Sequence, residues 1–267
     1  MRFTKVEGCG NHFILFDQTA QDIRYDEFSS AWVKQLCDPH FGIGADGVLC
    51  VRSDEHRRPR YEMVVYNADG SLAEMCGNGL RCVVRYLHLH HGLCENREGS
   101  AMILTGAGPL SVMFDGRDRV GVKMGWPEQM TPQPSQGYDL PVDRLSCYAL
   151  GNPHMVTLDS SHFAQREEIA PLWEQSVQGG INISFARQRS AHHVELYVYE
   201  RGCGWTLGCG TGACATVYHG YTQGLFQIDS TITVTLPGGD LSIDITAEGL
   251  TMWGEAHEVY RGTYLRA

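Results

Sequence analysis

Residues 61–79, YEMVVYNADGSLAEMCGNG, decide the fold, because the same design returns at residues 194–212, VELYVYERGCGWTLGCGTG. Each stretch opens with a run rich in β-branched and aromatic residues, which predicts a strand that ends in a turn. Nine residues beyond each predicted strand a cysteine precedes a glycine-rich turn, at Cys76 and at Cys209. The strands (61 and 194) and the cysteines (76 and 209) are both 133 residues apart, about half of the chain. The pattern predicts an internal duplication.

Weaker matches extend this duplication along the chain. They are short motifs that occur once in each half, namely Gly10-Asn11 with Gly151-Asn152, and Leu110-Ser111-Val112 with Leu241-Ser242-Ile243. Periodicity predicts a helix after each cysteine, over about 78–91 and 211–223. The sequence therefore predicts an α/β fold with two pseudo-symmetric lobes, each a curled, mostly antiparallel sheet around a central helix.

Two domains of similar size follow from the repeat. Residues 1–125 are expected to form the N-terminal lobe with Cys76, and residues 126–267 the C-terminal lobe with Cys209. The last strand of the chain could return to the N-terminal lobe. A chain of 267 residues is long enough to bury a core in each lobe.

The charge and the N-terminus narrow the class of protein. The formal net charge is -10, which argues against a general binder of nucleic acids or anionic membranes, since both need a basic surface. Neither a signal peptide nor a run of transmembrane length is expected, so the prediction is a cytoplasmic protein. The ten cysteines are then expected to stay reduced, and their spacings fit no common structural zinc site, so no metal is predicted.

The two repeated cysteines are candidates for acid/base chemistry. A helix start exposes unpaired N–H groups and a partial positive charge, which is expected to lower the pKa of a thiol there. The same N–H groups can hold a carboxylate. A single cysteine at a helix start is more often structural than catalytic, but two copies at one offset favour a paired role. If the lobes face one another, Cys76 could remove the α-proton of an amino acid while Cys209 returns one to the opposite face, or the reverse.

No cofactor is expected for such a reaction. A pyridoxal phosphate enzyme needs a Schiff-base lysine. The lysines here are Lys5, Lys34 and Lys123, and none lies in a recognisable cofactor motif. A carboxylate held at two helix starts would instead stabilise the developing carbanion.

Several motifs give the chain a family resemblance. They are NADGS (67–71) with MCGNGLRC (75–82), ERGCGWT (200–206) with CGTGA (209–213), GCGN (8–11), GIGADG (42–47), GNPH (151–154) and PGG (237–239). Together they resemble the diaminopimelate epimerase family over nearly the whole chain. The resemblance implies an isomerase that interconverts LL- and meso-diaminopimelate in the biosynthesis of lysine and peptidoglycan precursors. It also implies a homodimer.

The resemblance also implies roles for individual residues. Cys76 and Cys209 would be the two bases. The carboxylate at the reacting centre would be held by backbone N–H groups, those of Gly77, Asn78, Gly210 and Thr211. Further substrate contacts would come from polar and charged side chains, those of Asn11, Asn67, Asn152, Asn182, Glu200 and Arg201.

Two of these side chains carry charge. Glu200 would bind the reacting α-ammonium with help from the Arg201 carbonyl. The Arg201 guanidinium, with Asn67 and Asn182, would hold the distal amino-acid end, where a bidentate arginine suits a carboxylate. A surface ion pair is the alternative for Glu200 and Arg201.

Three positions depart from the family pattern. The family usually has aspartate at the position of His12, histidine near that of Glu7, and glutamate at that of Trp205. A loop histidine bonded to backbone is the expectation for His12, and packing is the expectation for Trp205. Changed pocket edges and a changed substrate preference are the alternatives.

Two rival functions remain open. The first is a cofactor-independent racemase of another amino acid, of the proline, hydroxyproline or histidine type. The second is a non-catalytic metal or redox protein that uses Cys76 and Cys209. Asn67, Asn182 and Arg201 favour a substrate with a second amino-acid head.

Overall fold

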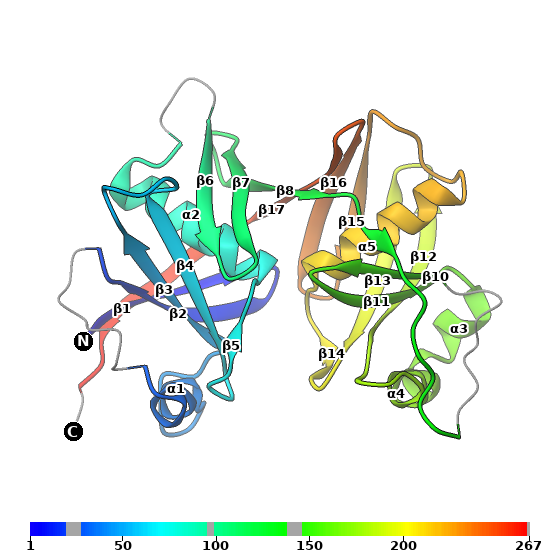
Figure 1. The fold of residues 1–267 in the computed structure, drawn as a ribbon, viewed down its shortest axis with the longest axis horizontal. Helices are drawn as coiled ribbons and strands as arrows, with labels where there is room; N and C mark the ends of the chain where they lie inside the picture. Colours follow the sequence, from blue (N-terminus) through cyan, green and yellow to red (C-terminus); the bar gives the residue numbers. More distant parts are fainter. Residues whose placement is uncertain (20–27, 95–98, 138–145, 266–267) are drawn as a thin grey trace. The chain divides into compact units, whose positions relative to one another are not determined.

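The computed structural model describes residues 1–19, 28–94, 99–137 and 146–265 and divides into two compact units (Figure 1). Unit 1 comprises Met1–Val122 and Gly254–Ala267, and unit 2 comprises Lys123–Trp253. The end of the chain belongs to unit 1 because its last strand, β18 (His257–Thr263), pairs antiparallel with β1 (Arg2–Gly8). The sequence left open whether the last strand belongs with 126–267 or returns to the N-terminal lobe, and in the structure this strand pairs within unit 1.

Unit 1 is a sheet with two helices. Its further strands are β2 (Asn11–Asp17), β3 (Gly47–Ser53), β4 (Tyr61–Asn67), β5 (Leu72–Ala73), β6 (Ser100–Thr105), β7 (Gly108–Phe114) and β8 (Arg119–Gly125). Its helices are α1 (Ser30–Cys37) and α2 (Gly77–His91). Hydrogen bonding gives the order β18-β1-β2-β3-β4-β6-β7-β8, with β5 also on β4. Only β2–β3 and β4–β6 are parallel.

Unit 2 repeats this order. Its strands are β9 (Glu128–Gln129), β10 (Ser146–Leu150), β11 (Asn152–Thr157), β12 (Asn182–Ser190), β13 (His193–Glu200), β14 (Gly204–Thr206), β15 (Ser230–Leu236), β16 (Gly239–Thr246) and β17 (Gly249–Glu255). They pair in the order β9-β10-β11-β12-β13-β15-β16-β17, with β14 also on β13, and only β11–β12 and β13–β15 are parallel. The helices are α3 (Ser160–Ala164), α4 (Arg166–Ser176) and α5 (Gly210–Thr222). The predicted fold class is confirmed, because each pairing in one unit has its equivalent in the other.

A central helix occupies each sheet. Helix α2 contacts β18, β1, β2, β3, β4 and β7, which are strands from most of the width of the unit, so the sheet must curl around it. Helix α5 contacts β10, β11, β12 and β16 in the same way. Leu80, Val83, Val84 and Leu87 of α2 are fully buried, which explains why this helix forms within the sheet rather than on its surface.

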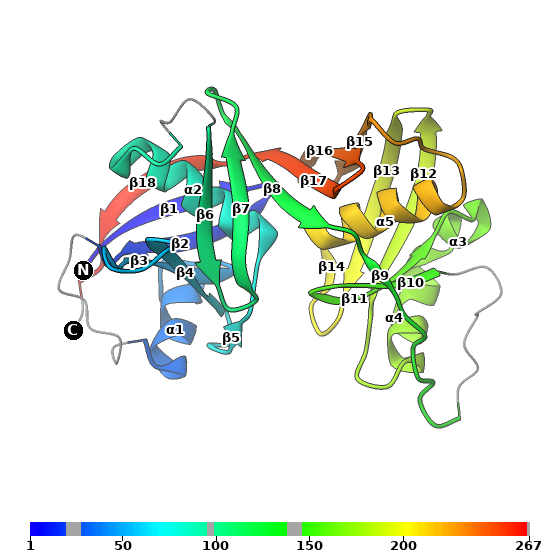
Figure 2. The same ribbon diagram turned by 45° about the horizontal axis from the view of Figure 1, so that its top comes forward.

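A second layer of helix covers the outside of each sheet (Figure 2). Helix α1 packs on β3 through Trp32, Val33 and Leu36. Helices α3 and α4 pack on β12. These helices lie in the connections between the parallel neighbours β2–β3 and β11–β12, where a crossover is required. Among the described residues, none of the helices combines the length and the apolar character needed to span a membrane.

Candidate functional site

Cys76 lies at the N-terminal cap of α2, the central helix of unit 1. Its backbone is extended (φ -139, ψ 114), and its sulfur accepts a hydrogen bond from the N–H of Gly79 at 3.4 Å. A Cβ at Gly79 would come within 2.9 Å of Leu49 Cδ2, so any side chain here would require Leu49 to shift. The Cys76 thiol donates to Asn11 Oδ1 at 3.9 Å, within the longer reach of sulfur. The side chain is partly buried.

Asn11 reaches this sulfur because a tight hairpin places it at the start of β2. Cys9 and Gly10 form the turn with φ of 57 and 76, which is the left-handed backbone that a two-residue hairpin needs. The Asn11 side chain donates from Nδ2 to Asp46 Oδ2 at 2.8 Å. Asp46 was given no role from the sequence, although it lies within the quoted GIGADG motif.

Asn78 and Asn67 are the other predicted side chains of unit 1. Asn78, in the first turn of α2, accepts a hydrogen bond from the buried Arg81 at 3.0 Å, so its amide faces the interior. Its backbone N–H remains part of the helix start. Asn67 ends β4 and donates to the Ser71 hydroxyl at 3.0 Å, within its own loop.

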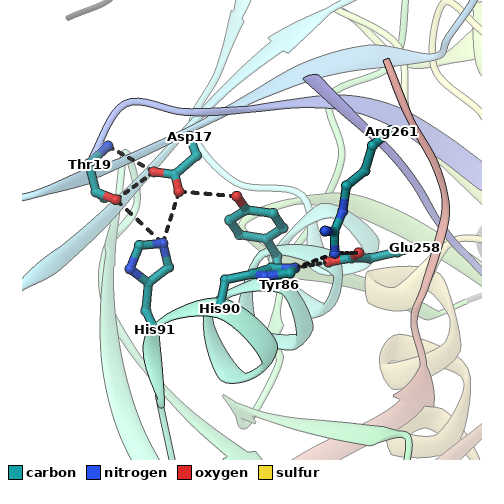
Figure 3. Close-up of polar contacts among 7 residues, drawn as sticks. All are labelled: Asp17, Thr19, Tyr86, His90, His91, Glu258 and Arg261. Atoms are coloured by element: carbon teal, nitrogen blue, oxygen red, sulfur yellow. Dashed lines mark hydrogen bonds and ion pairs between the residues drawn. The ribbon is translucent and has the colours of Figure 1, made fainter. Parts of the chain in front are cut away.

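The opposite end of α2 is fixed by partly buried polar contacts (Figure 3). Asp17 of β2 accepts hydrogen bonds from the Tyr86 hydroxyl at 3.0 Å and from Thr19, and it pairs with His91 Nε2 at 2.9 Å. Burial alone would raise the pKa of Asp17, but the hydrogen bonds from Thr19 and His91 outweigh it, so the pKa is lowered. The contacts tie the last turn of α2 to β2.

A second group ties the same turn to β18. His90 Nε2 lies 2.6 Å from Glu258 Oε1, and Arg261 lies 2.6 Å from Glu258 Oε2 (Figure 3). Cationic side chains at a helix C-terminus also interact favourably with the helix dipole. The cysteine end of α2 is therefore presented by a helix that is anchored at its far end.

Cys209 occupies the matching cap of α5 in unit 2, but its surroundings differ. The residue is 5% exposed, and its sulfur lies 3.5 Å from the Thr211 hydroxyl. Burial and the negative charge of Glu200 raise its pKa well above the ordinary value, although contacts from Thr211 and the Gly212 N–H oppose this. The prediction that the helix start lowers the pKa of this thiol is therefore wrong. The loss of solvation outweighs the helix terminus.

Glu200, the last residue of β13, lies next to this thiol. Its carboxylate accepts a hydrogen bond from the Thr206 hydroxyl at 2.6 Å. Burial raises its pKa, and hydrogen bonds from Thr206 and Cys209 oppose that shift. The alternative of a surface ion pair is wrong for Glu200, because its partners are a buried thiol and a hydroxyl.

His154 was missed from the sequence, although it ends the quoted GNPH motif. It is fully buried on β11, and its Nε2 lies 2.9 Å from the Thr211 hydroxyl and 3.2 Å from Asn152 Oδ1. Burial lowers its pKa to about 3, so the ring is neutral near pH 7. Its Nδ1 has no hydrogen-bond partner among the described residues. A chain of contacts thus joins Asn152, His154, Thr211 and Cys209.

Asn182, the first residue of β12, and Arg201, which follows β13, are in contact in the same unit. Asn182 is buried, accepts from the Arg201 backbone N–H at 2.9 Å, and donates to the Pro153 carbonyl at 3.0 Å. The Arg201 side chain is exposed and packs on Gly180, where a Cβ would lie 2.8 Å from its Cγ. Asn182 therefore places the Arg201 backbone, which the sequence alone did not reveal.

The departures from the family pattern have distinct outcomes. Trp205 packs against Tyr199 and Phe185, with ring centroids 5.3 and 5.8 Å apart, as expected for a packing residue. His12 does not match its expected backbone contact, because its ring Nδ1 lies 2.9 Å from Lys5 Nζ and its Nε2 lies 3.9 Å from Asp46.

Within the described residues, no group of three or more histidine, cysteine or acidic side chains is arranged to hold a metal ion. Each unit presents a thiol at the start of its central helix. In unit 1 the structure brings Cys76 and Asn11 together. In unit 2 it brings Cys209, Thr211, His154 and Glu200 together.

Comparison with known proteins gives a consistent result. The family model described as "Diaminopimelate epimerase" matches residues 3–130 and 147–259. The chain is 36% identical to a diaminopimelate epimerase from Synechocystis sp., covering 98% of both chains. It is 34% identical to another from Halothermothrix orenii, covering 98% of this chain and 97% of that one.

A solved structure shows the same fold at low identity. The chain superposes on a probable proline racemase from Agrobacterium radiobacter with a TM-score of 0.66 at 13% identity, covering 99% of this chain and 92% of that one. Such a likeness concerns the fold, because unrelated functions share folds.

Proposed function

Because the chain belongs to the diaminopimelate epimerase family, we propose that it is an isomerase that interconverts LL- and meso-diaminopimelate. The observation that carries the proposal is the duplicated cap: in two units of equal strand order, a cysteine is the residue before the central helix. A single cysteine of this kind is more often structural, whereas a pair supplies the two acid/base groups that a two-base inversion at carbon uses.

In the proposed reaction, one thiolate takes the α-proton and the opposite thiol gives its own proton to the other face. The C–H bond breaks on one side and forms on the other, so the substrate neither gains nor loses atoms. Cys76 and Cys209 are the proposed pair. After the reaction, the protonation states of the two sulfurs are exchanged. The enzyme is then ready to catalyse the reverse reaction in the next turnover.

The carboxylate beside the reacting carbon is proposed to bind at the helix starts. The donors are the backbone N–H groups of Gly77, Asn78, Gly210 and Thr211. All four residues lie in the first turn of α2 or α5, where helices leave N–H groups unpaired. Negative charge that develops on this carboxylate as the proton leaves would be stabilised there.

Glu200 is proposed to bind the α-ammonium of the substrate, and its contact with Cys209 gives this binding a consequence. Its negative charge contributes to the raised pKa of the thiol. A bound ammonium would offset that charge, so substrate binding would make the thiolate of Cys209 easier to form. The buried thiol would thus become a base mainly when substrate is present.

The distal end of the substrate is proposed to contact Arg201, Asn67 and Asn182, with Asn11 and Asn152 as further polar contacts. Arg201 has an exposed guanidinium suited to a second carboxylate. Asn182 already uses its oxygen and one N–H within the protein. Its contribution to substrate is therefore proposed to be one remaining N–H and the placement of Arg201.

The same family membership supports three further proposals. The enzyme would act in the biosynthesis of lysine and peptidoglycan precursors, in the cytoplasm, as a homodimer. Size-exclusion chromatography with light scattering would test the last point. A mass of one 29.7 kDa chain at micromolar concentration would contradict the dimer.

The activity itself can be tested with purified protein and LL-diaminopimelate in D₂O. We expect meso-diaminopimelate that carries solvent deuterium at the inverted carbon, detected by chiral separation and mass spectrometry. Exchange with L-proline, 4-hydroxyproline or L-histidine but not with diaminopimelate would instead support the rival racemase. Zinc binding without any exchange would support the metal or redox protein.

A further inference from the structure

Asn11 lies between a carboxylate and the Cys76 thiol. Its Nδ2 donates to Asp46 Oδ2 at 2.8 Å, and its Oδ1 accepts from the Cys76 thiol at 3.9 Å. All three residues belong to unit 1. They come from β2, the loop that precedes β3, and the cap of α2.

The chemistry of the carboxylate fixes the orientation of the amide. An ionised carboxylate only accepts hydrogen bonds, so the Asn11 group that faces Asp46 must be the NH₂. The carbonyl oxygen must then face the other way, toward the sulfur. Without Asp46 the two orientations of the amide would differ little, and the NH₂ could turn to the sulfur instead.

Asp46 is itself held in place on several sides. Its Oδ2 also accepts the backbone N–H of His12 at 2.9 Å, and its own N–H donates to the His12 carbonyl at 2.9 Å. Its carbonyl accepts the N–H of Ala68 at 3.1 Å. The carboxylate therefore has a fixed position even though its side chain is 46% exposed.

The ring of His12 faces the same carboxylate with a defined tautomer. Lys5 carries an ammonium that only donates, so His12 Nδ1, 2.9 Å from Lys5 Nζ, must accept. The ring proton is then on Nε2, which lies 3.9 Å from Asp46 Oδ1. Asp46 Oδ2 thus accepts hydrogen bonds from the Asn11 amide and from the His12 backbone N–H, and the His12 ring lies beside the same carboxylate.

We propose that Asp46 is a positioning residue that acts through Asn11 and keeps the amide carbonyl toward the Cys76 thiol. A carbonyl oxygen accepts the S–H proton but repels the lone pairs of a thiolate. The arrangement therefore favours the thiol form of Cys76 over its thiolate. The inference rests on the proposed function only in taking Cys76 as one of the two bases.

The test is the pH dependence of Cys76 alkylation by iodoacetamide, followed by peptide mass mapping without any substrate. Asp46→Ala frees the Asn11 amide to turn its NH₂ to the sulfur. We expect the midpoint of the Cys76 profile to fall by about one pH unit, the size of one hydrogen bond lost or gained. An unchanged midpoint would overturn the proposal.

The loss of charge alone would also favour the thiolate, so a second variant separates the two effects. Asp46→Asn removes the charge but can keep an oxygen at the position of Oδ2, where both Asn11 and the His12 N–H donate. We expect less than half of the shift seen with Asp46→Ala. An equal shift in both variants would show an effect of charge and would overturn the proposal.

A double-mutant cycle tests the route through Asn11. In an Asn11→Ala background, Asp46→Ala should move the midpoint by less than a third of its shift in the parent. Asn11→Ala alone should lower the midpoint, because the carbonyl is removed from the sulfur. A full shift from Asp46→Ala in this background would exclude the route.

Two internal controls keep the result interpretable. Buried Cys50 and Cys82 should remain unmodified in every variant, since their reaction would reveal lost folding. If Asp46→Ala fails this check, Asn11→Ala and Asp46→Asn still test the proposal. Asp54→Ala, which removes a similar turn aspartate that contacts His56 and Arg57, should leave the Cys76 profile unchanged. Because no turnover is measured, failure of the proposed epimerase activity would leave this readout intact.

Discussion

The two units have the same strand order and the same cysteine cap on the central helix, but the surroundings of the two cysteines differ. Cys76 of unit 1 is partly buried, with Gly79 and Asn11 as contacts. Cys209 of unit 2 is 5% exposed, and its contacts are Thr211 and the acidic Glu200. A duplicated frame can therefore hold two chemically different cysteines.

The strands beside the two helices also carry different residues at equivalent positions. In unit 1, Phe13 pairs with Gly47, and Gly47 pairs with Asn67. A Cβ at Gly47 would lie 2.5 Å from the Tyr66 carbonyl and 3.4 Å from the Phe13 ring, so this row accepts no side chain there. In unit 2 the pair equivalent to Phe13 and Gly47 is His154 and Asn182, so polar side chains lie where unit 1 has a phenylalanine and a glycine. The two units share the position of the thiol at the helix cap, whereas the raised pKa of Cys209 comes from its burial and from Glu200.

The largest expected effect comes from removing either thiol. Cys76→Ala and Cys209→Ala should each lower the epimerisation rate by about 10³-fold or more, because each removes one of the two proposed acid/base groups. Chiral separation of diaminopimelate products measures the rate. The matched control is Cys203→Ser, an exposed cysteine of unit 2, which should stay near the parent rate. A Cys76 variant with parent-like turnover would mean that the two units do not share the reaction.

The next effect tests what makes unit 2 different. Glu200→Gln removes the negative charge that helps to raise the pKa of Cys209. Alkylation of Cys209 should then begin at a lower pH than in the parent, while the epimerisation rate falls by about 10²-fold as the ammonium contact is lost. Glu195→Gln, on the same strand but paired with Arg187, is the control. A Cys209 profile that stays in place would contradict the contact with Glu200.

A third prediction concerns the buried histidine that unit 1 lacks. Burial lowers the pKa of His154 to about 3, below its ordinary value of 6.5. Between these two pH values the unfolded chain binds a proton at His154 and the folded chain does not. The contribution of the neutral ring to stability is therefore complete above pH 6.5 and is lost as the pH falls toward 3. Between pH 7 and pH 5 the parent should lose about 2 kcal/mol of unfolding free energy from this group.

The variant His154→Gln should remove that part of the pH dependence, as measured by urea unfolding at both pH values. The absolute stability at pH 7 also falls, so the comparison concerns the difference between the two pH values. His192→Gln, an exposed histidine in the same unit, should keep the parent slope. Equal slopes in the parent and His154→Gln would contradict a neutral buried ring.

The smallest effect concerns the anchor at the far end of unit 1's helix. Asp17→Asn weakens the contacts with Thr19 and His91 and should lower the unfolding free energy by about 1 kcal/mol at pH 7. The lowered pKa of Asp17 means that this contribution is present above its ordinary pKa and lost in acid, so parent and variant should converge at low pH. Thermal melts check this. Asp118→Asn, at an exposed ion pair with Arg85, should cost less.

The repeat was visible in the sequence because it has a local cause. A strand, a glycine-rich turn and a helix are each specified by residues close together in the chain, so residues 61–79 and 194–212 predicted the same unit twice. The placement of both cysteines at helix caps followed from the glycines after them, and the structure has both caps.

The partners of the thiols could not be predicted in the same way. The sequence suggested a lowered pKa for both, from the helix start alone. For Cys209 the direction is reversed, because folding removes the sulfur from solvent and brings Glu200 close to it. His154 and Asp46 lay in quoted motifs, but no spacing indicated that they reach Thr211 and Asn11.

The sequence by itself determined the duplicated α/β frame, the two helix caps and the family. These three features depend on short-range patterns of strand, turn and helix, which are present in both copies of the repeated segment. The tertiary structure decided the return of β18 to unit 1, the burial of Cys209 and the orientation of Asn11. Those features depend on solvent exclusion and on hydrogen bonds between residues far apart in the chain, which only the folded packing brings into contact.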